Sequence, residues 1–287
     1  MELSPELATI AVAAYGTTAP KAAIDPPKLF ISGLPKSGLH VAVRYALGML
    51  TQWDPEDNWY GTNAWHNRPN VEILKGAGMI LGSVERGQYI KGHLAYVKAV
   101  ERLLQILGFG LMFVYRDLRD VVVSQAYHFL SEDEVRFLFP HRDKYRGKSL
   151  ESVMLTSING DENVDPLFDR WDKFSGWLDC DWVLPMRFEE MILRRERAAK
   201  TFFEYIFNLA LKDSGVVEGH LHNDRVKKAA IQCILAETKM REKSPTFRKG
   251  KVGEWKREFT TAVTAAFKER DVNNWLIELG YAKNKDW

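Results

Sequence analysis

The sequence predicts an α/β protein, organised as a single three-layer domain with a central, mainly parallel sheet. Short continuous apolar runs, typical of strands buried on both faces, alternate along the chain with segments of helical spacing. The chain has 287 residues and a hydrophobic content of 46%, which is enough to bury a large core. We expect this domain to cover residues 28–287, after an extension at 1–27 that is rich in Ala, Thr and Pro and partly loose.

Each expected element follows from its local pattern. Four apolar runs are predicted to be strands, at residues 28–32, 87–93, 110–116 and 181–188. Helical spacing predicts helices at 39–50, 96–108, 117–129, 189–209, 225–239 and 260–278, with a short helix at 5–14 in the extension. The segment 130–170 is polar, charged and poorly periodic, so we expect it to form a lid-like insertion.

The first strand runs into a glycine loop, LFISGLPKSGLH, at residues 29–40. Two glycines frame four residues, as in a phosphate-binding P-loop, but Lys36 lies inside the loop, and Leu39 and His40 stand where Lys-Ser/Thr belongs. A glycine loop at a helix N-terminus directs backbone N–H groups and the positive end of the helix dipole at one anion. The sequence therefore predicts an anion site without the usual hydroxyl for Mg²⁺.

Basic side chains also follow two further strands. Lys91 and His93 lie at the end of the second expected strand, and Arg116 lies at the end of the third. Ligands of open parallel sheets bind beyond the carboxyl ends of the strands. We therefore expect these side chains to face the same site as the glycine loop.

Four motifs, in order along the chain, resemble those of the cytosolic-type sulfotransferases. LPKSG (34–38) is similar to their 5'-phosphosulfate loop, and IKGHL (90–94) to the strand end with their catalytic histidine. VYRDLRDVVVS (114–124) resembles their 3'-phosphate motif, and FRKGKVGEWKREFT (247–260) resembles their closing loop. The resemblance implies transfer of a sulfuryl group from 3'-phosphoadenosine-5'-phosphosulfate (PAPS) and release of adenosine 3',5'-bisphosphate (PAP).

The same resemblance implies a role for each matched residue. His93 would be the general base, Lys36 would stabilise the leaving phosphate, and Lys91 would steady the sulfuryl oxygens. The residues expected to bind the nucleotide are Pro35, Lys36, Ser37, Gly38, Leu39, His40, Arg116, Ser124, Phe188, Arg248, Lys249 and Gly250. Among them, Arg116, Arg248 and Lys249 would place three permanent cations around one site, which suits a dianionic 3'-phosphate. No metal is expected, because sulfuryl transfer places less negative charge at the reacting centre than phosphoryl transfer does.

The chain departs from the family pattern at several positions. Leu39, His40 and Val41 stand where the family has two threonines and a tryptophan, and Phe188 replaces a tyrosine that contacts adenine. His40 has two open roles, as a donor to the phosphosulfate or as an intrusion into the acceptor pocket. The dimer motif of some relatives is broken at Ala265, so no dimer is inferred.

Two other functions remain open at this stage. A P-loop kinase of small molecules would need the missing Lys-Ser/Thr and a magnesium-binding aspartate. A catalytically silent nucleotide-binding protein would not need His93, Lys36 and Arg116 together. Magnesium dependence separates the kinase from the sulfotransferase, and a product assay separates either from a silent binder.

Composition and charge limit the classes of partner that the protein is expected to bind. The formal net charge of +2 does not indicate nucleic-acid binding, and no apolar run is long enough for a membrane span. Two cysteines imply no disulfide framework and favour the reducing cytoplasm. The acceptor is expected to be a small molecule with a hydroxyl or amine. The aromatic segment NWYGTNAWHNRPN (58–70) is a candidate wall for a ring-bearing acceptor, through Trp59, Tyr60, Trp65 and His66.

Overall fold

The computed structural model describes residues 26–52, 80–131, 142–214, 224–239 and 250–287. Within these ranges five strands form one sheet in the order β2-β3-β1-β4-β5. The strands are β1 (Lys28–Gly33), β2 (Thr51–Gln52), β3 (Gln88–Lys91), β4 (Phe109–Tyr115) and β5 (Val183–Arg187). All four strand pairs are parallel, so the predicted α/β class with a parallel sheet is confirmed. The two-residue β2 was not predicted.

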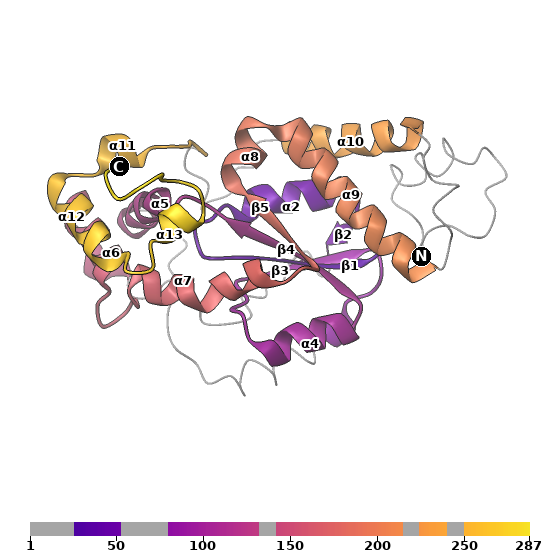
Figure 1. Cartoon of the computed structure of the whole chain (residues 1–287), viewed down its shortest axis with the longest axis horizontal. Helices are drawn as coiled ribbons and strands as arrows, with labels where there is room; N and C mark the ends of the chain where they lie inside the picture. Colours follow the sequence, from indigo (N-terminus) through magenta and orange to yellow (C-terminus); the bar gives the residue numbers. More distant parts are fainter. Residues whose placement is uncertain (1–25, 53–79, 132–141, 215–223, 240–249) are drawn as a thin grey trace.

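Alternate residues of the strands supply two separate cores. Leu29 and Ile31 of β1 belong to one hydrophobic cluster, and Phe30 between them belongs to the other, as the two-residue period of a strand requires. One face is covered by α2 (Leu39–Leu47), α8 (Phe188–Leu193), α9 (Arg195–Ser214) and α10 (Asp224–Lys239). The other face is covered by α4 (Lys98–Ile106), α5 (Leu118–Leu130), α6 (Leu150–Asn159) and α7 (Leu167–Ser175) (Figure 1). The molecule therefore has the three layers that the sequence predicts.

The described part of the expected lid-like insertion, residues 142–170, is largely helical and contributes several side chains to the core. After a 3-10 turn at Arg142–Tyr145, α6 packs on α5 and on α12 (Thr261–Arg270). Val153, Met154 and Ile158 of α6 are buried, and Ser149 caps the helix by accepting a hydrogen bond from the Ser152 N–H. Polar residues between these apolar positions hide the helical period. Residues 132–141 lie outside the described ranges, as does the predicted helix at 5–14.

The helix predicted at 260–278 is interrupted. Helix α12 ends at Arg270, and a separate short helix, α13 (Trp275–Glu278), follows. The Asp271 carboxylate accepts a hydrogen bond from the Trp275 N–H (2.7 Å), and Asn274 has a left-handed φ of 54°. A side chain that bonds the backbone ahead of it starts a new helix, which local apolar spacing does not reveal.

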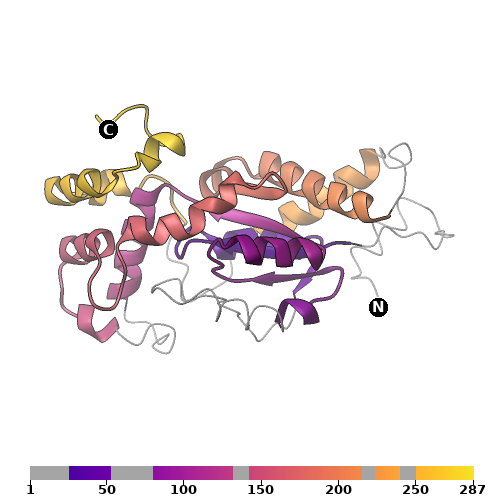
Figure 2. The ribbon, with the colours of Figure 1, turned by 60° about the horizontal axis from the view of Figure 1, so that its bottom comes forward.

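The elements after residue 250 return to the end of the sheet where α5 begins. The short α11 (Trp255–Glu258) packs on α5, α12 packs on α6, and α13 lies at the same end of the molecule (Figure 2). Among the helices of the described ranges, none combines the length and the apolar character needed to cross a lipid bilayer.

Candidate active site

The glycine loop joins β1 to α2, as predicted, and its two glycines are sterically required. A Cβ on Gly33 would lie 2.5 Å from the Val114 carbonyl oxygen of the neighbouring strand. Gly38 has a φ of 105°, and a Cβ there would lie 2.3 Å from the Phe188 ring. Lys36 also has a left-handed backbone, with a φ of 74°. These constraints give the loop a fixed shape immediately before the N-terminus of α2.

Two buried polar atoms at this loop lack a hydrogen-bond partner among the described residues. They are the Ser37 hydroxyl oxygen and the Arg116 Nε. Buried polar atoms are normally paired, so these two atoms at the loop are candidates for contacts with a bound ligand. Arg116 also donates to the Lys36 carbonyl oxygen (3.4 Å), and its guanidinium lies 4.2 Å from the centre of the Phe188 ring. These residues fit an anionic nucleotide phosphate.

The chain after β3 is fixed to β1, and this places His93. The Ser32 hydroxyl both accepts from the Leu94 N–H (3.0 Å) and donates to the Leu94 carbonyl (3.1 Å). The Gly92 N–H donates to the Ile31 carbonyl at 3.0 Å. Ser32 is a positioning residue that sequence reasoning missed, because its partner is 62 positions away.

A single hydrogen bond fixes the tautomer of His93. Its Nδ1 lies 2.7 Å from the carbonyl oxygen of Gly33, the residue before the loop. A carbonyl only accepts, so Nδ1 carries the hydrogen and Nε2 carries the lone pair. His93 is thus held in the form that a general base requires, next to the phosphosulfate loop.

The surroundings of His93 and His40 keep both rings neutral. Burial lowers the pKa of His93 to about 4; the Gly33 carbonyl opposes the shift and the charge on Lys36 adds to it. Desolvation by neighbouring atoms and then the charges on Lys91 and Lys36 lower the pKa of His40 to about 4. This holds although the His40 side chain is more exposed than that of His93. The structure therefore brings the predicted Lys36, Lys91, His40 and His93 together.

The pKa of His93 leads to a prediction about pH. The sequence alone suggests a free value near 6.5 and a titration close to neutrality. With a pKa of about 4, His93 is already a neutral base at pH 7 and is protonated only as the pH falls through about 4. We expect the NMR signal of the His93 ring, assigned with His93→Gln, to show no inflection between about pH 5.5 and 8 in the nucleotide-free protein. A midpoint near 6.5 would contradict this environment.

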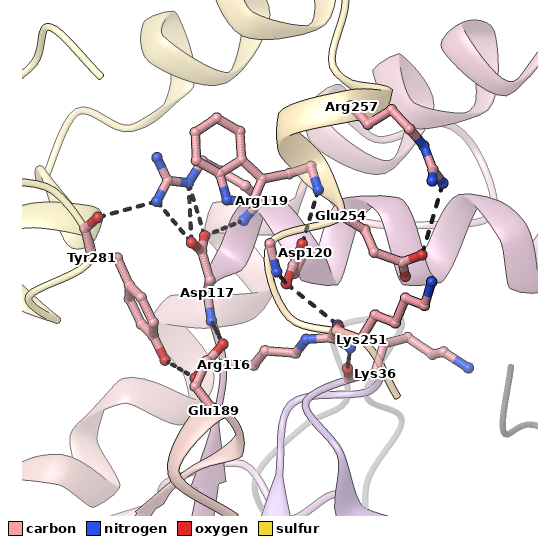
Figure 3. A network of polar contacts seen from close by, with 12 residues as sticks. Lys36, Arg116, Asp117, Arg119, Asp120, Glu189, Lys251, Glu254, Arg257 and Tyr281 are labelled. Atoms are coloured by element: carbon pink, nitrogen blue, oxygen red, sulfur yellow. Dashed lines mark hydrogen bonds and ion pairs between the residues drawn. The ribbon is translucent and has the colours of Figure 1, made fainter. Parts of the chain in front are cut away.

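The third and fourth motifs meet at the start of α5. Arg116 donates through Nη2 to the Lys251 carbonyl (2.8 Å), and the same nitrogen lies 3.5 Å from the Asp120 carboxylate. Asp120 in turn accepts from the N–H of Gly253 (2.7 Å) and from that of Trp255 (3.0 Å) (Figure 3). Gly250 directly precedes Lys251. The predicted Arg248 and Lys249 lie outside the described residues.

Two more predicted residues belong to this region. Ser124 lies on α5 one turn beyond Asp120, on the same helix face, and is half-buried. Phe188 begins α8 and is only 2% exposed, with its ring between Gly38 and Arg116. That ring supports the loop and the arginine. Its predicted contact with adenine stays a prediction. The proposed acceptor wall at 58–70 lies outside the described residues.

The site and fold agree with a family match. The family model of the sulfotransferase domain matches residues 26–271. The chain therefore belongs to the sulfotransferase family. The predicted class, a PAPS-dependent sulfotransferase with PAPS as co-substrate and PAP as product, is confirmed.

The fold resembles that of a solved sulfotransferase structure. The crystal structure of mouse sulfotransferase SULT7A1 complexed with PAP has 17% sequence identity, covers 96% of this chain and 94% of its own, and gives a TM-score of 0.55. A retinol dehydratase in complex with androsterone and PAP has 14% identity, covers 94% of this chain and 85% of its own, and gives a TM-score of 0.48. No curated protein matches the chain in sequence.

Proposed function

We propose that the protein transfers the sulfuryl group of PAPS to a hydroxyl or amine of a small-molecule acceptor, with His93 as the general base. The observation that carries this proposal is the 2.7 Å contact between His93 Nδ1 and the Gly33 carbonyl. Because Nδ1 carries the hydrogen in this contact, the lone pair is on Nε2. The same contact holds the ring against Gly33, the residue immediately before the phosphosulfate loop. The pKa of about 4 keeps that nitrogen unprotonated at neutral pH.

The residues around this histidine divide the chemistry between them. PAPS supplies the sulfuryl group in activated form. As the acceptor oxygen or nitrogen bonds to sulfur, His93 Nε2 takes the proton of the attacking group. Lys36 stabilises the negative charge that grows on the 5'-phosphate oxygen as the bond from that oxygen to sulfur breaks. Lys91, at the end of β3, adds positive charge to the site and is proposed to contact the sulfuryl oxygens.

We assign the 3'-phosphate to the region where α5 meets the closing segment. Arg116 already has its guanidinium oriented by the Phe188 ring and by the carbonyl groups of Lys36 and Lys251. Ser124 adds a hydroxyl donor, and Arg248, Lys249 and Gly250 would complete the set by resemblance. Charge-assisted bonds to phosphate are the strong ones, so this side of the nucleotide supplies much of its affinity.

The acceptor is assigned only by chemical class. The four aromatic and histidine side chains of residues 58–70 would suit a planar or ring-bearing molecule such as a phenol or steroid. Neither Cys180 nor Cys233 forms a disulfide in the described part of the chain, which supports action in the reducing cytoplasm.

Label transfer tests the proposed reaction. Purified protein is incubated with ³⁵S-labelled PAPS, with EDTA, and with a panel of phenols, steroids and aliphatic amines. We expect label to appear on at least one acceptor together with stoichiometric PAP, and His93→Gln to abolish both. Label that never leaves the nucleotide would favour a catalytically silent nucleotide-binding protein. An absolute need for added Mg²⁺ would favour a P-loop kinase.

A further inference from the structure

Asp120 places a negative charge where the proposed function needs positive ones. Its side chain is buried, with the residue 1% exposed, and lies 3.5 Å from the Arg116 guanidinium assigned to the 3'-phosphate. Simple electrostatics makes a carboxylate unfavourable next to a phosphate site. A buried carboxylate at this position therefore needs another physical reason.

The contacts of Asp120 supply that reason. One carboxylate oxygen accepts from the Gly253 N–H at 2.7 Å, and the other accepts from the Trp255 N–H at 3.0 Å. Gly253 has a left-handed φ of 76°, so the chain turns sharply where Asp120 holds it. The Lys251 carbonyl, two residues earlier, accepts from Arg116. The closing segment, residues 250–255, is thus bound to Asp120 on α5 and to Arg116, which lies four residues earlier, between β4 and that helix (Figure 3).

A second anchor lies beside the first. The Arg119 guanidinium lies 3.7 Å from the centre of the Trp255 ring and 4.5 Å from that of Trp287. Asp117 holds this guanidinium with a 2.7 Å ion pair, and the Tyr281 carbonyl accepts from it at 3.1 Å. Trp255 is therefore fixed by its backbone to Asp120 and by its indole to Arg119. Both anchors act on the same end of the closing segment.

We propose that Asp120 is a positioning residue for nucleotide recognition: it docks the closing segment so that this segment and Arg116 hold the 3'-phosphate together. The Arg119 cage between Trp255 and Trp287 supports the same docking. This inference rests on the proposed function, because it assumes that a 3'-phosphate binds at Arg116. It assigns Asp120 a role through other residues and no contact with the nucleotide.

The substitution Asp120→Asn separates docking from charge, because the two effects have opposite signs. Removing a negative charge beside Arg116 would tighten phosphate binding if charge alone mattered. Replacing the carboxylate by an amide leaves one acceptor oxygen for two backbone N–H groups and turns an NH₂ toward one of them. Docking therefore predicts weaker binding of PAP. AMP, which lacks the 3'-phosphate, should bind almost as before.

Calorimetric titration with PAP and with AMP measures both affinities for each variant. We expect Asp120→Asn to weaken PAP at least tenfold and AMP less than about threefold, as loss of a charge-assisted contact network would. Asp271→Asn is the matched control, because Asp271 is also a buried carboxylate that accepts from two backbone N–H groups, those of Trp275 and Leu276. It should leave the PAP-to-AMP ratio unchanged.

Trp287→Ala provides an independent variant of the second anchor, should Asp120→Asn fail to fold. It removes one wall of the Arg119 cage and should weaken PAP several-fold with AMP unchanged. An unchanged or tighter PAP affinity in the folded variant, or an equal loss for both nucleotides, would overturn the inference. Wild-type protein that does not prefer PAP over AMP would instead contradict the 3'-phosphate assignment itself.

Discussion

Replacing His93 by alanine is expected to lower kcat about 10²–10⁴-fold, the usual contribution of a general base. The affinity for PAP should stay within a factor of about two, because the ring is proposed to act on the acceptor side and its Nδ1 is directed at the Gly33 carbonyl. Steady-state rates with the acceptor found by label transfer, combined with calorimetry on PAP, separate the two effects.

A matched histidine makes the His93 result interpretable. His128, on α5, lies in the described part of the chain outside the predicted site, and His128→Ala should keep the wild-type rate. Added imidazole should restore part of the activity of His93→Ala and none to a variant that is merely misfolded. If His93→Ala kept most of its activity, His93 would be structural, and His40 would be the first alternative base to test.

The second large effect is expected at Lys36. This residue has a φ of 74°, a left-handed backbone that lysine and alanine both adopt rarely because of their Cβ atoms. Asparagine tolerates the left-handed region and removes the charge alone. We expect Lys36→Asn to weaken PAP at least tenfold, since one charge-assisted contact is worth about 1.5–3 kcal/mol, and to lower kcat as well.

The double effect follows from where Lys36 acts. Its ammonium group would contact the 5'-phosphate in the ground state. It would stabilise this phosphate more strongly in the transition state, as negative charge grows there. Lys98→Asn, an exposed lysine on α4, is the control and should change neither quantity. A Lys36→Asn enzyme with normal kcat and weak donor binding would show that Lys36 only binds.

The sheet could be predicted from the sequence because its strands are continuous apolar runs. Leu29 to Ile31 and Leu111 to Val114 are fully buried, so their composition alone marks them. The anion-binding loop could be predicted equally well, because a strand, a glycine loop and a helix are local features of the sequence. The sequence was enough to place Lys36 and Arg116 at one edge.

What sequence reasoning missed depends on contacts between distant residues. The Asp120 bond to Gly253 spans 133 positions, and the Ser32 bond to Leu94 spans 62. No local period or motif encodes such pairs. An aspartate four residues after an arginine is first interpreted as a salt bridge within a helix. The same limit applies to the pKa of His93, because burial by the folded chain sets it.

The most direct test of the assigned site is the discrimination between PAP and AMP by wild-type protein. Arg116 and the closing segment are assigned to a 3'-phosphate that only PAP carries, so calorimetry should give PAP an affinity at least tenfold higher. Arg116→Ala should remove most of that preference without a comparable loss for AMP. Equal affinities of the wild-type protein for PAP and AMP would contradict the assignment of this site to PAPS.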